Sequence, residues 1–315
     1  MKRHLKDFDV GEVFTGFFIL RKKDLRSRRD GVPYLTLEFC DCSGRLKGNI
    51  WEDAERFYHS LKEGGVVKLK GLIETYRGSK QVAIKQIRNS REKDSYELSD
   101  LMPTTEIDRE ATFQRIYKLI EGFRNPYLKQ LLLVFFDDEA FKDDFISAPG
   151  GKLWHHNRIG GLIEHTMSVV RICRMLARFY PVVNPDLLLS GAILHDVGKI
   201  EEYRYDTMIE YSDRGRLVGH ITLGASLIRE MAYQIDDFPD DLLDKLTHLI
   251  LSHQGEREFG SPIPPSTREA FLLHYADLID SKMDALQRIS KEIPEGQRWE
   301  YVNLLGRFID FDETT

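Results

Sequence analysis

The stretch Ile193-Leu194-His195-Asp196-Val197-Gly198-Lys199-Ile200 places an imidazole and a carboxylate side by side near the end of an apolar run. The run predicts a helix over residues 187–200. Neighbouring residues of a helix lie about 100° apart, so both side chains could reach one metal ion on that face. Lys199 follows His195 by four residues and Asp196 by three, which predicts that its charge projects from the same side toward an anionic substrate. Taken alone, the pair is better explained by a buried histidine beside a capping aspartate.

The distribution of the other histidines favours a metal site over that simpler explanation. Eight of the ten histidines lie after residue 148, in the part of the chain that also contains the dyad: His155, His156, His165, His195, His220, His248, His253 and His274. A helix is predicted over 162–180, and on it His165 shares an apolar face with Val169, Ile172 and Leu176. A buried histidine on such a face needs a partner, and a metal ion is one.

Three further candidate ligands lie on or at the ends of predicted helices. We expect His220 to open a helix that runs to about residue 234, His253 to end a helix over 241–252, and Asp277 to lie on a helix over 267–288. His248 lies about 140° around the helix from His253 and should not share the site. His274 is expected to have a packing or hydrogen-bonding role. Between the His195-Asp196 dyad and His220, the pattern predicts a hairpin-like excursion, in which residues 208–211 and 217–218 flank a turn.

Composition indicates a protein of about two domains. The chain has 315 residues, of which 42% are hydrophobic, and its three cysteines suit free thiols in a reducing cytoplasm. No apolar run reaches the roughly 18 residues of a membrane span, and the N-terminus has no signal-peptide core. Residues 1–95 hold 21 Lys/Arg against 14 Asp/Glu, whereas the remainder holds 24 against 37. This asymmetry favours a polyanion partner for the first part and divalent metal for the second.

The first ninety residues alternate in the manner of short strands. Strands are predicted over 11–21, 32–41, 45–51, 66–76 and 81–87, with a helix over 52–61 and a charged loop over 26–31. This order, with the stretch LTLEFCDCSGRLKGNIWEDA (35–54), resembles the OB-fold nucleic-acid-binding domains. Such domains bind single strands by stacking bases on aromatic side chains while basic residues follow the backbone. The candidates for these contacts are Tyr34, Lys47, Trp51, Arg77 and Lys80.

The chain is therefore expected to be a multidomain α and β protein, with a five-stranded OB-like β-barrel followed by an all-α domain. We assign 1–92 to the barrel, 93–148 to a helical connector packed on the second domain, and 149–315 to that domain. The connector is expected to contain helical segments over 107–123, 128–136 and 140–146. Residues 295–315 are expected to form a final helix and tail that pack on the domain or meet another subunit.

The order His165…His195-Asp196…Asp277 resembles the HD superfamily of metal-dependent phosphohydrolases. The blocks GGLIEHT, GAILHDVGK, LVGHITLG and LSHQGEREFGSPIPPSTREAFLLHYADLIDSKM carry this resemblance. With the OB-like module, the whole chain resembles the YhaM-type 3′–5′ exoribonucleases. The resemblance implies that His165, His195, Asp196 and Asp277 bind one metal ion. In two-metal members Asp196 bridges to a second ion, which His220 and His253 would hold here.

One position departs from the pattern of related chains, which often have His-His-Gly where this chain has His253-Gln254-Gly255. This departure leaves occupancy of the second site open. Imidazole and carboxylate ligands suit one or two divalent transition-metal ions, Mn²⁺ or Co²⁺ before Fe²⁺ or Ni²⁺. His156, just before the first ligand helix, is a candidate for contact with a substrate phosphate.

These patterns predict a metal-dependent phosphodiesterase. The resemblance implies that it hydrolyses single-stranded RNA, with single-stranded DNA left open, from the 3′ end to nucleoside 5′-monophosphates. Attack would come from a metal-bound hydroxide, with Lys199 and Asp196 as catalytic residues. Two alternatives remain: an HD-type nucleotide phosphohydrolase or cyclic-nucleotide phosphodiesterase, and a non-catalytic nucleic-acid-binding protein. We expect a cytoplasmic protein without membrane contact, and self-association is left open.

Overall fold

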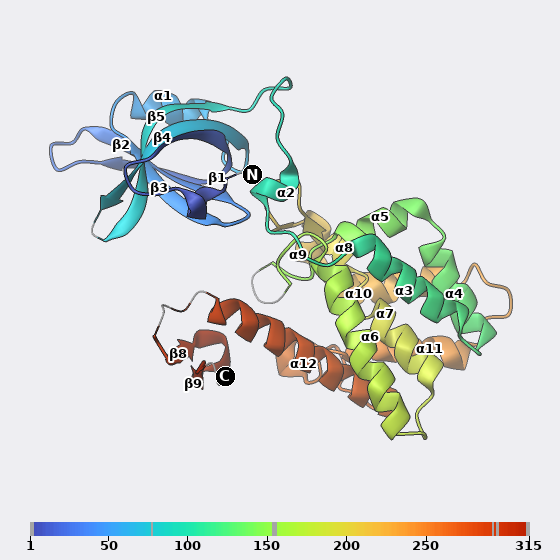
Figure 1. The fold of residues 1–315 in the computed structure, drawn as a ribbon. Coiled ribbons are helices and arrows are strands. Elements are labelled where there is room, and N and C mark those ends of the chain that lie inside the picture. The colour runs from blue at the N-terminus through green and yellow to red at the C-terminus, as the bar shows by residue number, and fades with distance from the viewer. Residues whose placement is uncertain (1–2, 77, 153–155, 292, 294–295, 313–315) are drawn as a thin grey trace.

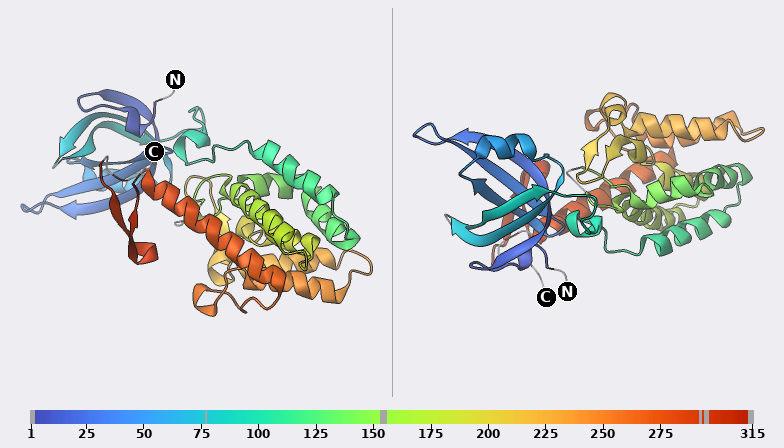
Figure 2. Two further views of the ribbon diagram at one scale, coloured as in Figure 1. Left: turned by 60° about the horizontal axis from the view of Figure 1, so that its bottom comes forward. Right: turned by 90° about the horizontal axis from the view of Figure 1, so that it is seen from above.

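A β-barrel and a domain of helices form two lobes (Figure 1). The computed structural model describes residues 3–76, 78–152, 156–291, 293 and 296–312. A long helix, α12 (Arg268–Ser290), leads from the helical lobe back toward the barrel side of the molecule, and a β-hairpin follows it (Figure 2). Among the described residues, no helix combines the length and the apolarity that a membrane crossing requires.

Five strands close the N-terminal barrel. They are β1 (Val13–Ser27), β2 (Pro33–Asp41), β3 (Gly44–Ile50), β4 (Val66–Tyr76) and β5 (Ser79–Asn89), with helix α1 (Ala54–Ser60) between β3 and β4. They pair in the order β1-β2-β3-β5-β4, and β4 returns to β1, so the sheet closes on itself. Alternation decides which side chains fill the interior: Leu35, Leu37 and Phe39 of β2 are fully buried, whereas the residues between them are not. The predicted five-stranded OB-like barrel is confirmed.

The first strand is longer than the sequence predicted. Instead of ending near Arg21, β1 continues to Ser27, and Arg26 pairs with Tyr34 across the β1–β2 ladder. The polar side chains of this part face solvent, so charge was no obstacle to strand formation. The first residues of the expected charged loop therefore belong to the barrel wall.

The connector fastens the barrel to the helical lobe through a small apolar cluster. Leu101, at the end of α2 (Leu98–Leu101), and Met102 are buried against Ile19 and Val66 of the barrel. A second contact comes from the helical lobe, where the Thr207 hydroxyl donates to the Gly64 carbonyl. The barrel and the helical lobe are thus joined by packed side chains as well as by the chain itself.

The helical lobe is built around one apolar core. Its helices are α3 (Arg109–Glu121), α4 (Pro126–Phe136), α5 (Glu139–Ser147), α6 (Gly161–Phe179), α7 (Pro185–Leu194), α8 (Lys199–Glu202), α9 (Asp213–Leu217), α10 (His220–Ala232), α11 (Asp240–Ser252) and α12. Two of them begin alike: Asn125 caps α4 and Asn184 caps α7, each followed by a proline at the first helical position. The all-α character predicted for this domain is confirmed, apart from two small hairpins.

Three local predictions were wrong. The helix expected over 187–200 is broken, because α7 ends at Leu194 and a turn over 195–198 precedes α8. The excursion before His220 is a hairpin of β6 (Tyr203–Arg204) and β7 (Glu210–Tyr211), and the region expected to be its turn is helix α9. The expected C-terminal helix is a hairpin of β8 (Trp299–Val302) and β9 (Arg307–Asp310).

Candidate metal centre

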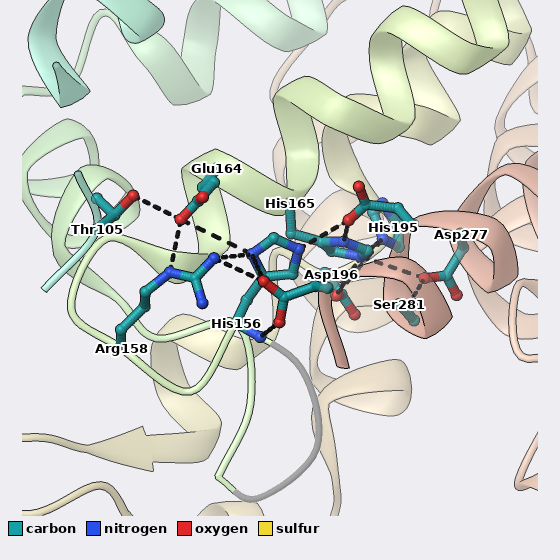
Figure 3. A network of polar contacts seen from close by, with 12 residues as sticks. Thr105, His156, Arg158, Glu164, His165, His195, Asp196, Asp277 and Ser281 are labelled. Atoms are coloured by element: carbon teal, nitrogen blue, oxygen red, sulfur yellow. Dashed lines mark hydrogen bonds and ion pairs between the residues drawn. The ribbon is translucent and has the colours of Figure 1, made fainter. Parts of the chain in front are cut away.

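Five elements converge at the centre of the helical lobe. His165 comes from the second turn of α6, His195 and Asp196 from the turn after α7, and Asp277 from α12. His220 opens α10, and His253 follows the last residue of α11. His165, His195 and His253 are completely buried, and Asp196 is 2% exposed. Figure 3 shows the His165, His195, Asp196 and Asp277 side chains directed toward one another.

A glycine allows α10 to begin directly on the turn that carries the dyad. A Cβ atom on Gly198 would lie 2.1 Å from the carbonyl oxygen of His220 and 2.6 Å from the amide nitrogen of Gly224. Because both neighbours are backbone atoms of α10, no side-chain movement could make room. Gly198 is therefore what brings His220 next to Asp196.

The two oxygens of Asp196 face two separate groups of ligands. Oδ2 lies 3.5 Å from His165 Nε2 and 3.4 Å from His195 Nε2. Oδ1 lies 3.6 Å from both His220 Nε2 and His253 Nε2. Asp196 thus stands between two candidate metal positions with one oxygen directed to each.

The first position is completed by Asp277. Its Oδ1 lies 3.2 Å from His165 Nε2, and the His165 and His195 Nε2 atoms are 3.1 Å apart. His165, His195 and Asp277 form one cluster of candidate ligand atoms, and Asp196, His220 and His253 form another. The structure therefore brings together all six residues that the sequence predicted as ligands.

All four imidazoles are held with Nε2 toward the centre. Each Nδ1 meets an oxygen on the outer side: Asp280 Oδ2 at 2.7 Å for His165, the Ala192 carbonyl at 3.0 Å for His195, Glu202 Oε1 at 2.9 Å for His220 and the Ile250 carbonyl at 2.7 Å for His253. A carbonyl or ionised carboxylate can only accept, so Nδ1 carries the proton and the Nε2 lone pair is available to a metal.

Burial and neighbouring charge shift the pKa values of the imidazoles in opposite directions. Burial lowers the pKa of His195, and it lowers the pKa of His253 to about 4, so both are neutral at pH 7. Burial also acts to lower the pKa of His165, but hydrogen bonds to Asp277 and Asp280 outweigh it and raise that pKa to about 9. Without a metal ion, His165 is therefore protonated on both ring nitrogens at pH 7, and a metal ion must displace the proton on Nε2 to bind there.

The central carboxylates are ionised despite their burial. Burial alone would raise the pKa of Asp196, but the charge of Lys199 leads several interactions that hold it well below its ordinary range. Burial likewise acts to raise the pKa of Asp277, and the hydrogen bond with His165 is the largest effect that keeps it low. The site therefore presents two negative oxygen ligands and four imidazoles to a cation.

Two buried atoms indicate a site for a cation. Asp196 Oδ1 and His220 Nε2 are buried, and neither has a hydrogen-bond partner among the described residues. A buried polar atom without a partner costs about 1–3 kcal/mol, and a divalent ion between them would satisfy both. Imidazole and carboxylate are ligands that divalent transition metals prefer, so the residues present fit such an ion.

Lys199 lies on the other oxygen of Asp196. It is 4% exposed, and its Nζ lies 2.5 Å from Asp196 Oδ2 and 2.5 Å from the Gly150 carbonyl. Lys199 lies beside Asp196, as predicted, although Lys199 begins α8 and Asp196 lies in the turn before it. Its ammonium group offers a fixed positive charge at the edge of the first metal position.

The remaining histidines lie outside these two clusters, although His156 forms a third such group with His165 and Asp280. His248 accepts a hydrogen bond from the Ser266 amide through Nε2, and His274 donates through Nδ1 to the His253 carbonyl, as its predicted hydrogen-bonding role requires. His156 is buried, and its Nε2 lies 2.8 Å from Asp280 Oδ2. His155 lies outside the described residues.

On the barrel, the predicted nucleic-acid contacts occupy two parts of the outer face. The Tyr34 and Trp51 rings stack with centroids 5.0 Å apart, and the Arg28 guanidinium lies 4.8 Å from the Trp51 ring centre. Further along, Lys47 and Lys80 line a groove of about 500 Å³. Arg77 lies outside the described residues.

Comparison with known proteins identifies the family. The model of the HD domain family matches residues 162–282, and that of an OB-fold nucleic acid binding domain matches residues 19–89. A protein of Listeria monocytogenes serotype 4b (strain CLIP80459) named 3′-5′ exoribonuclease YhaM is 33% identical over 297 residues, which cover 94% of each chain. The chain belongs to the YhaM exoribonuclease family. Relatives of the same name from Oceanobacillus iheyensis and Geobacillus sp. (strain WCH70) are 32% and 30% identical and cover 94% and 97% of this chain. The predicted membership of the YhaM type and of the HD superfamily is confirmed.

Membership of the YhaM family makes this an HD-superfamily enzyme of the metal-dependent phosphodiesterase class, as predicted. HD domains bind divalent metals, and the ligand clusters described above could hold them. The OB-fold module indicates binding of single-stranded nucleic acid, in agreement with the excess of positive charge in the first 95 residues.

Sequence reasoning missed the acidic residues behind the ligands. Asp280 accepts a hydrogen bond from His165 Nδ1. Glu202 accepts hydrogen bonds from both the Nδ1 atom and the backbone amide of His220. Asp280 lies three residues after Asp277, one helical turn away, which is a signal that could have indicated it. Glu202 follows the dyad in a charged run and gave no such signal.

Asp280 also joins His165 to a network of charged groups that continues outward. Figure 3 shows His156, Arg158 and Glu164 of this network. His156 adopts a left-handed backbone conformation with φ of 46°, and its amide donates to Asp284 Oδ2 at 2.7 Å. Arg158 donates to Asp284 Oδ1 at 2.7 Å and to Glu164 Oε2 at 2.8 Å. Through Glu164, the network thus supports α6, the helix that carries His165, in addition to the hydrogen bond from His165 to Asp280.

Proposed function

We propose that this chain is a metal-dependent 3′–5′ exoribonuclease that shortens single-stranded RNA and releases nucleoside 5′-monophosphates. The observation that carries the proposal is the position of Asp196, with one oxygen facing His165 and His195 and the other facing His220 and His253. The names of its YhaM relatives supply the polarity and the RNA substrate.

The ligand assignment follows from the two clusters. His165, His195 and Asp277 would hold one ion together with Asp196 Oδ2, and Asp196, His220 and His253 would hold the second. Such ions lower the pKa of a water molecule and neutralise charge on phosphate oxygens. We favour Mn²⁺ or Co²⁺, then Fe²⁺ or Ni²⁺, because the ligand set mixes imidazole with carboxylate.

The residues of the chain would orient the phosphate and stabilise the charge that develops on it. The oxygen of a water molecule forms a bond to phosphorus, the P–O3′ bond breaks, and O3′ of the shortened strand takes a proton. We assign Lys199 to a non-bridging phosphate oxygen, where its charge stabilises the pentacoordinate state. Its burial beside Asp196 supports this role, because a charge in a dry site acts more strongly than one in water.

The barrel would hold the strand that leads into this site. Bases would stack on the exposed rim formed by Tyr34 and Trp51, and phosphates would meet Lys47 and Lys80. Trp51 is 51% exposed, so a base could take the place of the Arg28 guanidinium over its ring. Arg77 stays a candidate from the sequence. The buried position of His156 supports a role behind the metal ligands, not contact with RNA.

Four broader assignments accompany this function. We place the domain boundaries at 1–92, 93–148 and 149–315, and we leave single-stranded DNA open as a second substrate. A cytoplasmic location suits the three free thiols. Self-association is supported by an apolar row on the outer face of α12, where four side chains are about half exposed: Phe271, Tyr275, Ile279 and Met283.

A single assay tests the reaction and separates it from hydrolysis of free nucleotides. Purified protein with Mn²⁺ is given 5′-labelled RNA, labelled single-stranded DNA, dNTPs and cyclic nucleotides. A ladder that shortens from the 3′ end, present in Asp244→Ala and absent in Asp196→Ala, supports the proposal. Asp244 is a matched control because its carboxylate is 75% exposed and lies on the surface of α11. Turnover of free nucleotides alone would replace the proposal with a nucleotide phosphohydrolase.

Lys199→Ala tests the role of the lysine. Removing a positive charge beside the ligands cannot weaken attraction for a cation, so metal affinity should be kept or increased. The rate should fall by about 100-fold or more, in line with the loss of one group that stabilises a developing oxyanion. Calorimetry and single-turnover cleavage separate the two effects, and loss of metal in this variant would contradict the assignment.

A further inference from the structure

Gln254 places an amide group beside His253, one of the candidate ligands of the second metal position. It follows His253 at the end of α11, is half-buried, and its Nε2 lies 3.2 Å from His253 Nε2. The His253 Nε2 atom also faces Asp196 Oδ1. The Gln254 side chain therefore ends beside an atom that would bind metal, not in solvent.

The spacing of these atoms is that of neighbouring ligands on one ion. With metal–ligand distances of about 2.1 Å, adjacent ligands of an octahedral ion lie about 3.0 Å apart. The first cluster has this spacing, with 3.1 Å between His165 Nε2 and His195 Nε2 and 3.2 Å between His165 Nε2 and Asp277 Oδ1. The 3.2 Å between Gln254 and His253 belongs to the same range.

The hydrogen bonding of His253 shows how the amide would respond to an ion. His253 Nδ1 donates to the Ile250 carbonyl, so its Nε2 has a lone pair, and the Gln254 N–H donates to that lone pair. An ion on Nε2 would take the lone pair and repel the N–H group. A half-turn of the terminal amide would then exchange nitrogen for oxygen and direct a carbonyl oxygen at the ion.

We propose that Gln254 is a ligand of the second ion through its amide oxygen, a proposal that depends on the two-ion arrangement proposed above. The second position then has two imidazoles, one carboxylate oxygen and one neutral amide oxygen. Amide and carboxylate oxygens suit Mn²⁺ and Mg²⁺, whereas imidazole suits Zn²⁺, Fe²⁺ and Ni²⁺. Gln254 therefore shifts the preference of the second position toward Mn²⁺.

Three substitutions separate a ligand from a hydrogen-bond donor. Gln254→Leu removes both the oxygen and the N–H group, Gln254→Glu keeps an oxygen and loses the donor, and Gln254→His supplies a nitrogen ligand instead. Gln234→Leu is the matched control, since Gln234 is exposed just after α10. Mn²⁺ titration by calorimetry gives affinity and stoichiometry. Two Mn²⁺ ions about 3.5–4 Å apart also give an exchange-coupled electron paramagnetic resonance signal, which reports the second ion without an activity assay.

The proposal predicts a distinct order of affinities for the second ion. Gln254→Leu should weaken Mn²⁺ binding at this position by about 10- to 100-fold and remove the coupled signal, with the first ion unchanged. Gln254→Glu should bind as tightly as the original chain or more so, and Gln254→His should favour Zn²⁺ over Mn²⁺. If Gln254→Leu matches Gln234→Leu, or if Gln254→Glu is as weak as Gln254→Leu, Gln254 is not a ligand. If the unsubstituted chain binds no metal at all, the proposed function itself fails.

Discussion

Replacing Asp280 by asparagine should weaken metal binding at the first position about 10- to 100-fold, which is the usual effect of losing a carboxylate behind a metal-bound histidine. Asp280 Oδ2 lies 2.7 Å from His165 Nδ1 and 2.8 Å from His156 Nε2. The amide oxygen of asparagine can accept the same hydrogen bonds but carries no charge. At about 1.4 kcal/mol for each factor of ten, the loss corresponds to about 1.4–2.7 kcal/mol.

The size of this loss should depend on pH. Hydrogen bonds to Asp277 and Asp280 oppose burial and raise the pKa of His165 to about 9, so below that pH a proton competes with the metal ion. Asp280→Asn weakens the competing proton as well as the metal, and the two effects partly cancel at low pH. The affinity difference between the variant and the original chain should therefore be smaller at pH 6.5 than at pH 8.5.

Isothermal titration with Mn²⁺ at these two pH values measures both effects. Asp244→Asn, on the exposed surface of α11, controls for the change of charge. The melting temperature of the metal-free protein checks that Asp280→Asn still folds. Equal affinities of Asp280→Asn and the control at pH 8.5 would refute the role assigned to Asp280 behind His165.

Three other predictions follow from the site and the barrel. Below pH 9 the His165 imidazole is positively charged, so the apparent metal affinity should rise about tenfold per pH unit up to about pH 9 and then level off. Calorimetry in buffers of different ionisation enthalpy should detect about one proton released at pH 7. An affinity independent of pH between 6 and 8 would contradict this. Gly198→Ala should displace the start of α10, since its Cβ would lie 2.1 Å from the His220 carbonyl oxygen. The melting temperature should fall by several degrees, and Mn²⁺ titrations should no longer detect the second ion. An unchanged number of bound Mn²⁺ ions would contradict this. Trp51→Ala should cost about 1–3 kcal/mol in binding of a single-stranded oligonucleotide, measured by fluorescence anisotropy, and leave cleavage of a dinucleotide unchanged; equal oligonucleotide affinity would remove Trp51 from the path of the strand.

Patterns of local periodicity predicted the fold well where one face of an element is buried. Leu35, Leu37 and Phe39 alternate because a barrel wall has one inner face, and α6 shows its apolar stripe because one side packs on the core. The C-terminal hairpin shows where this reasoning failed. Spacings of three and four between Tyr301, Leu305 and Phe308 suggested a helix, but Gly306 turns the chain with φ of 62° and pairs the two segments.

The ligands themselves could be predicted only because their order along the chain resembles a known family. Spacing alone could not bring Asp277 to His165, since the two lie on different helices and more than a hundred residues apart. Nor could it indicate Glu202, because an acidic residue in a charged run looks like part of a solvated surface. Its role depends on α10 starting beside the dyad, which is a tertiary contact through Gly198.

Hydrogen bonds of Thr105 and Glu164 link the barrel to the metal centre. Thr105, just after the apolar cluster that joins connector and barrel, donates its hydroxyl to Glu164, which lies one residue before His165 on α6. Glu164 also accepts from Arg158, so the start of α6 is fixed by charge on one side and by the connector on the other. In the proposed function the barrel holds the strand that the metal centre cleaves, so the distance between them matters. Because these bonds join α6, which carries His165, to the segment that packs on the barrel, one continuous set of contacts sets the relative positions of barrel and metal centre.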